Sequence, residues 1–199
     1  MAKNKIVIAN HKMNMLSSDI NIYLKKIKEQ INIENVIICP SCIYIPYFLK
    51  QNFKVGIQNI FYKSKGAYTG EISPRQAKSM EVDYAIVGHS ERRKYFLETN
   101  NEINQKIELC LKNNLKVILC IGENKEEKYE GKTKEVLESE LVENLANISN
   151  LEDVIIAYEP IWAIGTNETP TTNEIDIYTR YIKQIVKKHF NFKNIKVVY

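Results

Sequence analysis

Short runs rich in isoleucine and valine alternate along the chain with longer segments in which apolar residues recur every three or four positions. The short runs are nearly continuously apolar, which is typical of parallel strands buried on both faces. They predict seven strands, at residues 5–9, 35–39, 54–58, 83–87, 116–120, 154–158 and 195–199.

The longer segments predict amphipathic helices, because apolar residues three and four positions apart lie on one face of a helix. Thr99 and Thr171 each stand three positions before a glutamate, Glu102 and Glu174, and this spacing is typical of a capping box at a helix start. Three apolar stripes carry the helical pattern: Ile20, Tyr23, Leu24, Ile27 and Ile31; Ile103, Ile107, Cys110 and Leu111; and Leu137, Leu141, Leu145 and Ile148.

Strands and helices that alternate in this way predict an α/β fold, and seven units in a row favour a (β/α)8 barrel. An open doubly wound sheet stays possible on the pattern alone, although its phosphate fingerprint is absent, because residues 9–12 contain no glycine. No linker-like stretch divides the chain, so we expect a single domain over residues 1–199. A closed barrel needs an eighth strand, and we therefore expect an incomplete barrel whose eighth βα unit is missing.

Composition and charge narrow the range of partners. The formal charge of +4 results from 28 basic and 24 acidic residues that are interleaved, a balance that does not indicate nucleic-acid binding. The first apolar run, residues 6–9, is too short for a signal peptide, and no later run approaches a membrane span. We therefore expect a cytoplasmic protein without a membrane partner. Cys39 and Cys42 have the spacing of a redox or zinc half-site, but a second pair is missing, so reduced structural thiols are expected.

Polar residues stand directly after three of the predicted strands. Asn10 and Lys12 follow the first strand, His89 and Glu91 the fourth, and Glu159 the sixth. In α/β barrels these strand ends meet at one mouth, where the chemistry takes place. A carboxylate can remove a proton from carbon, an imidazole can serve carbonyl and hydroxyl oxygens, and an ammonium group can stabilise an enediolate. Each residue also has an ordinary explanation as a core histidine, a surface charge or a turn former, but their shared position favours catalysis.

The segment after Glu159 has the composition of a short closing lid. Pro160 stiffens the exit from the strand, and Gly165 permits backbone angles that other residues avoid. An ordinary turn behind a surface glutamate is the alternative. The predicted lid consists of Pro160, Ile161, Trp162, Ala163, Ile164, Gly165 and Thr166.

Six segments of the chain resemble the triosephosphate isomerase family. They occur in that family's order and with its natural spacing, and together they extend over the whole chain. The segments are 10–14 (NHKMN), 56–59 (GIQN), 66–71 (GAYTGE), 87–93 (VGHSERR), 120–123 (CIGE) and 158–166 (YEPIWAIGT).

This resemblance implies a TIM barrel that interconverts dihydroxyacetone phosphate and glyceraldehyde 3-phosphate through an enediolate, in glycolysis and gluconeogenesis. By motif position, Glu159 would be the general base, and His89 would move protons between the two oxygens. Lys12 would hold and polarise the substrate beside Asn10, and Glu91 resembles the family's second carboxylate near the lysine. The family's histidine is kept neutral by a helix N-terminus, and Ser90 and Glu91 follow His89 as a helix start.

The resemblance also implies an assembly. Gly165 would belong to the lid whose backbone amides meet the substrate phosphate. Thr69 lies in a segment similar to the loop through which each subunit reaches its neighbour, so a homodimer is expected. A small phosphorylated triose is the expected substrate, and the family implies neither a cofactor nor a metal.

Two departures from the family pattern bear on these expectations. His11 stands where the family usually has tryptophan, and along extended chain its side chain should point away from Asn10 and Lys12. The family's phosphate loops after strands seven and eight would follow Tyr199, so we expect the isolated 199-residue chain to be poorly folded and nearly inactive. A different sugar-phosphate enzyme on the same barrel and a non-catalytic remnant or interaction protein are the alternatives.

Overall fold

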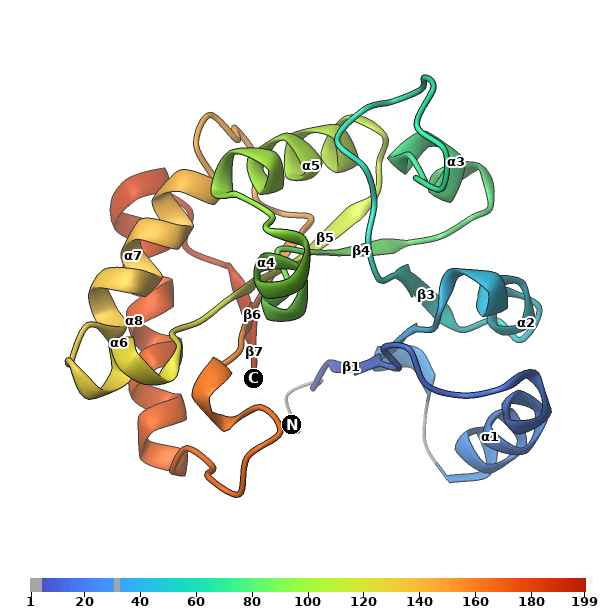
Figure 1. Cartoon of the computed structure of the whole chain (residues 1–199), viewed down its shortest axis with the longest axis horizontal. Helices are drawn as coiled ribbons and strands as arrows, with labels where there is room; N and C mark the ends of the chain where they lie inside the picture. Colours follow the sequence, from blue (N-terminus) through green and yellow to red (C-terminus); the bar gives the residue numbers. More distant parts are fainter. Residues whose placement is uncertain (1–4, 31–32) are drawn as a thin grey trace.

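The computed structural model describes residues 5–30 and 33–199. One sheet of seven parallel strands, hydrogen-bonded in chain order, curls through the molecule as an open barrel wall (Figure 1). This arrangement confirms the prediction of an incomplete (β/α)8 barrel. The strands are β1 (Val7–Asn10), β2 (Val36–Cys39), β3 (Lys54–Ile57), β4 (Tyr84–Val87), β5 (Lys116–Ile121), β6 (Val154–Tyr158) and β7 (Lys196–Val198).

Several strand ends differ from the predicted ranges by one or two residues. β1 begins at Val7, which faces the first residue of β2, Val36, and it ends at Asn10 opposite Cys39. β7 begins at Lys196 because pairing with β6 starts there. Apolar character therefore located the strands, whereas the hydrogen-bond register sets where they end.

Helices cover the outside of the sheet (Figure 1). Among the described residues, none of them combines the length and the hydrophobicity needed to cross a membrane. The helices are α1 (Ser17–Gln30), α2 (Ile45–Leu49), α3 (Pro74–Ser79), α4 (Ser90–Phe96), α5 (Asn100–Lys112), α6 (Lys125–Tyr129), α7 (Thr133–Asn144) and α8 (Thr172–Phe190), with 3-10 turns η1 (Ile33–Asn35), η2 (Cys42–Tyr44) and η3 (Ile161–Ala163).

The predicted helix starts and apolar stripes are largely confirmed. Thr99 and Thr171 both form complete capping boxes, which open α5 and α8. The third stripe was predicted too long as a helix, because α7 ends at Asn144, although Leu145 beyond it is fully buried. Ile31 of the first stripe lies outside the described residues.

Alternate residues of each strand pack into two separate cores, as the two-residue period of a strand requires. In β5, Val117 and Leu119 point toward the helices, whereas Ile118 and Cys120 point into the barrel. The outer core is the larger, and it ties the helices to the wall. The inner core consists of Ile37, Cys39, Ile86, Ile118, Cys120 and Ile155.

The first and last strands leave the barrel wall open. Within the described residues β1 pairs with β2 and β7 pairs with β6, and the two strands are not paired with each other. Residues of both strands, including Ile8 and Val198, line one cavity of about 320 Å³. The interior of the barrel is therefore accessible between its two edges.

Candidate functional site

Lys12 stands two positions after the end of β1, in a backbone conformation that lysine rarely adopts. Its φ is +52°, in the left-handed region where a side chain costs conformational energy. Three hydrogen bonds hold it there. The Lys12 amide donates to Asn10 Oδ1 at 3.0 Å, and the Lys12 carbonyl accepts from Ser41 Oγ at 3.0 Å and from Gln58 Nε2 at 2.9 Å. Three neighbouring strand ends thus fix where the ammonium group begins.

His89 follows β4 and caps the N-terminus of α4, as the sequence predicted. The side chain is buried, and its Nδ1 accepts a hydrogen bond from the Glu91 amide at 3.2 Å. A ring nitrogen that accepts an N–H carries no proton itself, so in the neutral ring the proton sits on Nε2. The helix end therefore selects the tautomer and directs Nε2–H into the barrel mouth.

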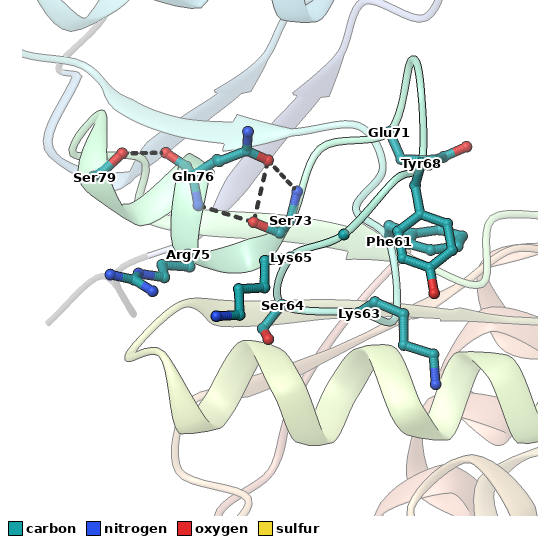
Figure 2. A pocket seen from close by; sticks show the side chains of 11 residues that line it. Phe61, Lys63, Ser64, Lys65, Tyr68, Glu71, Ser73, Arg75, Gln76 and Ser79 are labelled. Carbon is teal, nitrogen blue, oxygen red and sulfur yellow. Dashed lines mark hydrogen bonds between the residues drawn. The ribbon is translucent and has the colours of Figure 1, made fainter.

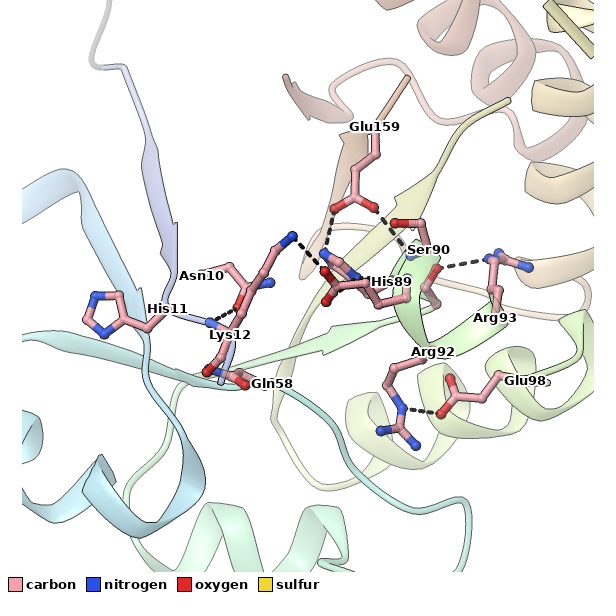
Figure 3. Close-up of polar contacts among 12 residues, drawn as sticks. Asn10, His11, Lys12, Gln58, His89, Ser90, Arg92, Arg93, Glu98 and Glu159 are labelled. Atoms are coloured by element: carbon pink, nitrogen blue, oxygen red, sulfur yellow. Dashed lines mark hydrogen bonds and ion pairs between the residues drawn. The ribbon is translucent and has the colours of Figure 1, made fainter. Parts of the chain in front are cut away.

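Glu159 meets His89 at the end of β6 (Figure 3). His89 Nε2 lies 3.3 Å from Glu159 Oε1, and the Ser90 amide donates to Oε2 at 3.4 Å. On the other side of His89, Lys12 Nζ lies 2.8 Å from Glu91 Oε1. A carboxylate, an imidazole and an ammonium group from three elements thus gather at one end of the barrel.

Two adjoining cavities open onto this group. One, of about 400 Å³, is lined by Lys12 and Glu91, and the other, of about 320 Å³, is lined by Glu159. Asn10 and His89 line both. The imidazole therefore stands between the space that reaches the lysine and the space that reaches the carboxylate.

The predicted lid leaves Glu159 and turns away from both cavities. Its centre is the turn η3, and Gly165 has a φ of +69°, which explains why glycine occupies that position. The Thr166 hydroxyl donates to the carbonyls of Trp162 and Ala163 at 3.2 Å each. Gly165 and Thr166 are exposed and line neither cavity, so the structure does not bring the lid tip to the site.

Trp162 anchors the lid to Glu123, a residue to which the sequence gave no role of its own. The indole Nε1 donates to Glu123 Oε1 at 2.9 Å, and the Tyr158 hydroxyl lies 3.2 Å from both carboxylate oxygens. Burial raises the pKa of Glu123, although these donors oppose the shift. The Lys128 ammonium lies 3.0 Å from the centroid of the indole ring. The sequence did offer one indication that Glu123 matters: it ends the segment 120–123, one of the six segments that resemble the family.

Cys120, a buried cysteine of the inner core, also touches the site. Burial, and then the Glu159 carboxylate with which the thiol hydrogen-bonds, raise the pKa of Cys120 well above its usual range. Its inward position follows from the alternation of β5 and could have been found by counting positions from Ile118. The buried Cys39 and the exposed Cys42 are both free thiols.

His11 points away from the site, as expected (Figure 3). Its ring packs edge-on against Tyr23 and Phe48, with ring centroids 4.9 and 5.6 Å away. Because of this burial the pKa of His11 is lowered.

Thr69 lies between β3 and α3 in an exposed loop, of which Figure 2 labels Lys65 and Tyr68. The Phe61 amide donates to the Ile72 carbonyl at 2.8 Å and closes the base of this loop, and the Phe61 and Tyr68 rings lie 4.8 Å apart. A cavity of about 460 Å³ separates the loop from α3, and Lys65 lines it. Thr69 is exposed, and its neighbour Gly70 lines the cavity that Lys12 also lines.

Among the described residues, no three His, Cys, Asp or Glu side chains are grouped so that they could hold a metal ion. The chemistry that the arrangement can perform is proton transfer. Glu159 can accept a proton, His89 can donate one from Nε2, and Lys12 can balance negative charge between them.

Comparisons with known proteins agree with this chemistry. The family model of triosephosphate isomerase matches residues 5–199. A triosephosphate isomerase from Clostridium botulinum (strain Loch Maree / Type A3) is 37% identical over 196 residues, which are 94% of this chain and 79% of the relative. One from Thermodesulfovibrio yellowstonii is 40% identical over 191 residues, 92% of this chain and 78% of the relative. One from Dehalococcoides mccartyi (strain CBDB1) is 44% identical over 189 residues, 91% of this chain and 74% of the relative. The chain belongs to the triosephosphate isomerase family.

Proposed function

We propose that the protein interconverts dihydroxyacetone phosphate and glyceraldehyde 3-phosphate by proton transfer. The observation that carries this proposal is the 3.3 Å contact between His89 Nε2 and Glu159 Oε1, with the Lys12 ammonium at the same barrel mouth. A base, an acid and a cation so arranged suit proton abstraction next to a carbonyl group. The membership of the chain in the family supports the substrate.

Glu159 acts as the general base in this proposal. Its carboxylate takes a proton from the carbon beside the carbonyl group, and the electron pair moves to the carbonyl oxygen to give an enediolate. His89 protonates that oxygen from Nε2 and takes the proton of the neighbouring hydroxyl group. Glu159 then returns its proton to the other carbon, which completes the isomerisation without a net gain or loss of protons.

Lys12 and Asn10 hold the substrate and stabilise the enediolate, because a fixed positive charge lowers the energy of the developing anion. Glu91 Oε1 lies 2.8 Å from Lys12 Nζ and keeps the ammonium group directed toward the barrel mouth. The positive φ of Lys12 supports this role, since unusual backbone angles persist where the surroundings enforce them.

The lid closes over the bound substrate in our proposal, and its Gly165 amide meets the phosphate group. Closure excludes water, which protects the enediolate phosphate from losing phosphate by elimination. Residues Pro160, Ile161, Trp162, Ala163, Ile164, Gly165 and Thr166 move as this lid.

We further propose a homodimer in which the loop that carries Thr69 reaches the neighbouring subunit. The exposure of Thr69 supports this arrangement. We also propose a cytoplasmic location, which the membership of the chain in the triosephosphate isomerase family supports. Sedimentation of the protein expressed from its complete gene should give a particle of twice the chain mass. The Thr69→Arg variant should sediment with a larger fraction of monomer.

The test of the activity is a coupled assay with each triose phosphate on the protein expressed from its complete gene. Glu159→Gln keeps the shape of the side chain but removes the base, and kcat should fall by about 10²–10⁴-fold, the usual contribution of a general base. Glu152→Gln is the matched control, because the exposed Glu152 lies just before β6 and Glu159 lies just after it.

The outcomes separate the alternatives. An active wild type with an inactive Glu159→Gln variant and a normal Glu152→Gln variant supports the proposal. Turnover of another sugar phosphate but not of the trioses would favour a different enzyme on this barrel. A folded wild-type protein without any such turnover would favour a non-catalytic interaction protein.

A further inference from the structure

An ion pair behind the site joins the two backbones that carry His89 and Glu159. Its first member is Arg93 on α4, whose Nε donates to the Gly88 carbonyl at 2.9 Å (Figure 3). Gly88 follows the last residue of β4, has a φ of +74° and directly precedes His89. Arg93 therefore holds the peptide from which the imidazole projects.

The second member is Glu140 on α7, whose Oε2 accepts from the Gly122 amide at 2.9 Å. Gly122 packs directly on the backbone of Glu159, because a Cβ at position 122 would lie 1.7 Å from the Glu159 carbonyl oxygen. The residues on either side of Gly122 bind the same segment. The Glu159 amide donates to the Ile121 carbonyl at 2.8 Å and the Ile161 amide to the Glu123 carbonyl at 3.0 Å.

Arg93 and Glu140 also contact each other. Arg93 Nη1 lies 3.5 Å from Glu140 Oε1 and donates to Asn100 Oδ1 at 2.6 Å. Both charged side chains are largely buried, at 17% and 14% exposed. A continuous path of contacts thus runs from Gly88 through Arg93 and Glu140 to Gly122.

We expect the ion pair between Arg93 and Glu140 to contribute little to the stability of the folded protein. Burial raises the pKa of Glu140 to about 7, even though Arg93 and the Gly122 amide favour the charged form. Buried ion pairs often contribute little to stability, because desolvation offsets the attraction between the charges. Local features that cost folding free energy are found where a site needs a fixed geometry.

We propose that Arg93 and Glu140 form a positioning pair that sets the separation of His89 and Glu159. The inference rests on the proposed roles of His89 and Glu159, but the geometry that it concerns is defined without reference to activity. Neither member of the pair touches the substrate, and each acts through the glycine peptide that it holds.

The test compares Glu140→Asp with Glu143→Asp in the protein expressed from its complete gene. Aspartate keeps the charge but withdraws the carboxylate from the Gly122 amide by one carbon–carbon bond. Glu143 lies nearly one turn along α7 and accepts hydrogen bonds from Ser139 and Asn100, without contacting Gly122. Glu140→Gln, which keeps the length of the side chain and an acceptor for the Gly122 amide, is the rescue variant. Crystal structures, steady-state kinetics and melting temperatures are measured for all of them.

We expect Glu140→Asp to change the 3.3 Å distance between His89 Nε2 and Glu159 Oε1 by more than about 0.5 Å, the tolerance of a productive site. Its kcat should fall roughly 10- to 100-fold with little change in KM, since a misplacement of about 1 Å can cost about 100-fold. Glu140→Gln should recover most of that loss, and Glu143→Asp should stay within about twofold of the wild type because it leaves this geometry intact.

A merely structural role would lower the melting temperature and the folded fraction while the His89–Glu159 distance and the kcat of folded molecules stayed unchanged. That result would overturn the proposal. The crystallographic comparison does not use turnover, so an unchanged distance rejects the positioning pair even in an inactive protein. A wild type that lacks isomerase activity but shows the expected change in distance would reject the proposed function and retain the pair.

Discussion

The indole of Trp162 donates a hydrogen bond from Nε1 to the buried carboxylate of Glu123 at 2.9 Å. This bond joins the lid after β6 to the segment after β5. The Tyr158 hydroxyl lies 3.2 Å from the same carboxylate, and Lys128 lies over the indole ring. The lid is thus held in place by its middle, and its exposed end, which contains Gly165, has no such anchor among the residues described.

Trp162→Phe tests this anchor, because it keeps an aromatic ring in place but removes the donor to Glu123. A buried carboxylate that loses a partner is left with uncompensated desolvation, so the free energy of unfolding should fall by about 1–3 kcal/mol in urea titrations. Tyr181→Phe removes a hydroxyl that donates to Glu138 at 3.1 Å, near the surface, and should change stability by less than about 0.5 kcal/mol. Equal effects of the two substitutions would argue against an anchor at Glu123.

Gly122→Ala tests the close approach of β5 to Glu159. The new Cβ would lie 1.7 Å from the Glu159 carbonyl oxygen, so the backbone that carries the base must move. We expect kcat to fall by about 100-fold, the loss associated with a misplacement of about 1 Å. Gly131→Ala is the control for the added methyl group, because a Cβ there meets no atom within 4 Å. Gly131 has a φ of +72°, so alanine strains the backbone there, whereas Gly122 has no positive φ and differs by its close contact with Glu159. Comparable kcat values in the two variants would contradict the prediction.

The sequence could predict the fold and most of the candidate site, because both depend on local patterns. Apolar runs located the strands, and the polar residues within about three positions of the end of each run identified Lys12, His89 and Glu159. The contact between Trp162 and Glu123 could not be derived in this way, since it depends on the register between β5 and β6. The same holds for Glu140, which the helical pattern places on α7 without indicating that it reaches Gly122. What the sequence does not reveal is how elements far apart in the chain align with one another, and these two contacts depend on that alignment rather than on residue type.

His11 should make the stability of the protein depend on pH on the acid side. Burial against Tyr23 and Phe48 lowers the pKa of His11 below 6.5 in the folded state, so the unfolded chain binds the proton more tightly. Stability should therefore fall as the pH drops below that value. His11→Phe keeps an aromatic ring and should reduce the fall in the urea midpoint between pH 7.5 and pH 5, estimated from the reference pKa of about 6.5. His189→Phe, at a partly exposed position beside Glu138, is the matched control and should not reduce it.

Glu140 should make the stability of the protein depend on pH in the opposite direction, so that stability falls as the pH rises. Its pKa is raised from 4.5 to about 7 by burial, with Arg93 opposing the shift and Glu127 and Glu123 adding to it. The folded state then holds a proton that the unfolded state has lost, so stability present at low pH is lost as the pH rises from about 4.5 to about 7. Glu140→Gln cannot ionise and should lack this loss. Its free energy of unfolding should gain on the wild type across that window by up to about 3 kcal/mol, since each pKa unit is worth about 1.4 kcal/mol.

The change of this difference with pH is the decisive quantity, because glutamine also alters the hydrogen bonding and packing at this position and so shifts stability by an amount that does not depend on pH. Glu143→Gln supplies a control of the opposite sign. Hydrogen bonds from Ser139 and Asn100 lower the pKa of Glu143, so its contribution is present above pH 4.5 and is lost as the pH falls. Urea titrations at intervals of half a pH unit should show the Glu140→Gln difference growing between pH 4.5 and pH 7 while the Glu143→Gln difference stays level there. A level Glu140→Gln difference would mean that the buried carboxylate is already ionised at pH 4.5 and that Arg93 compensates its burial in full.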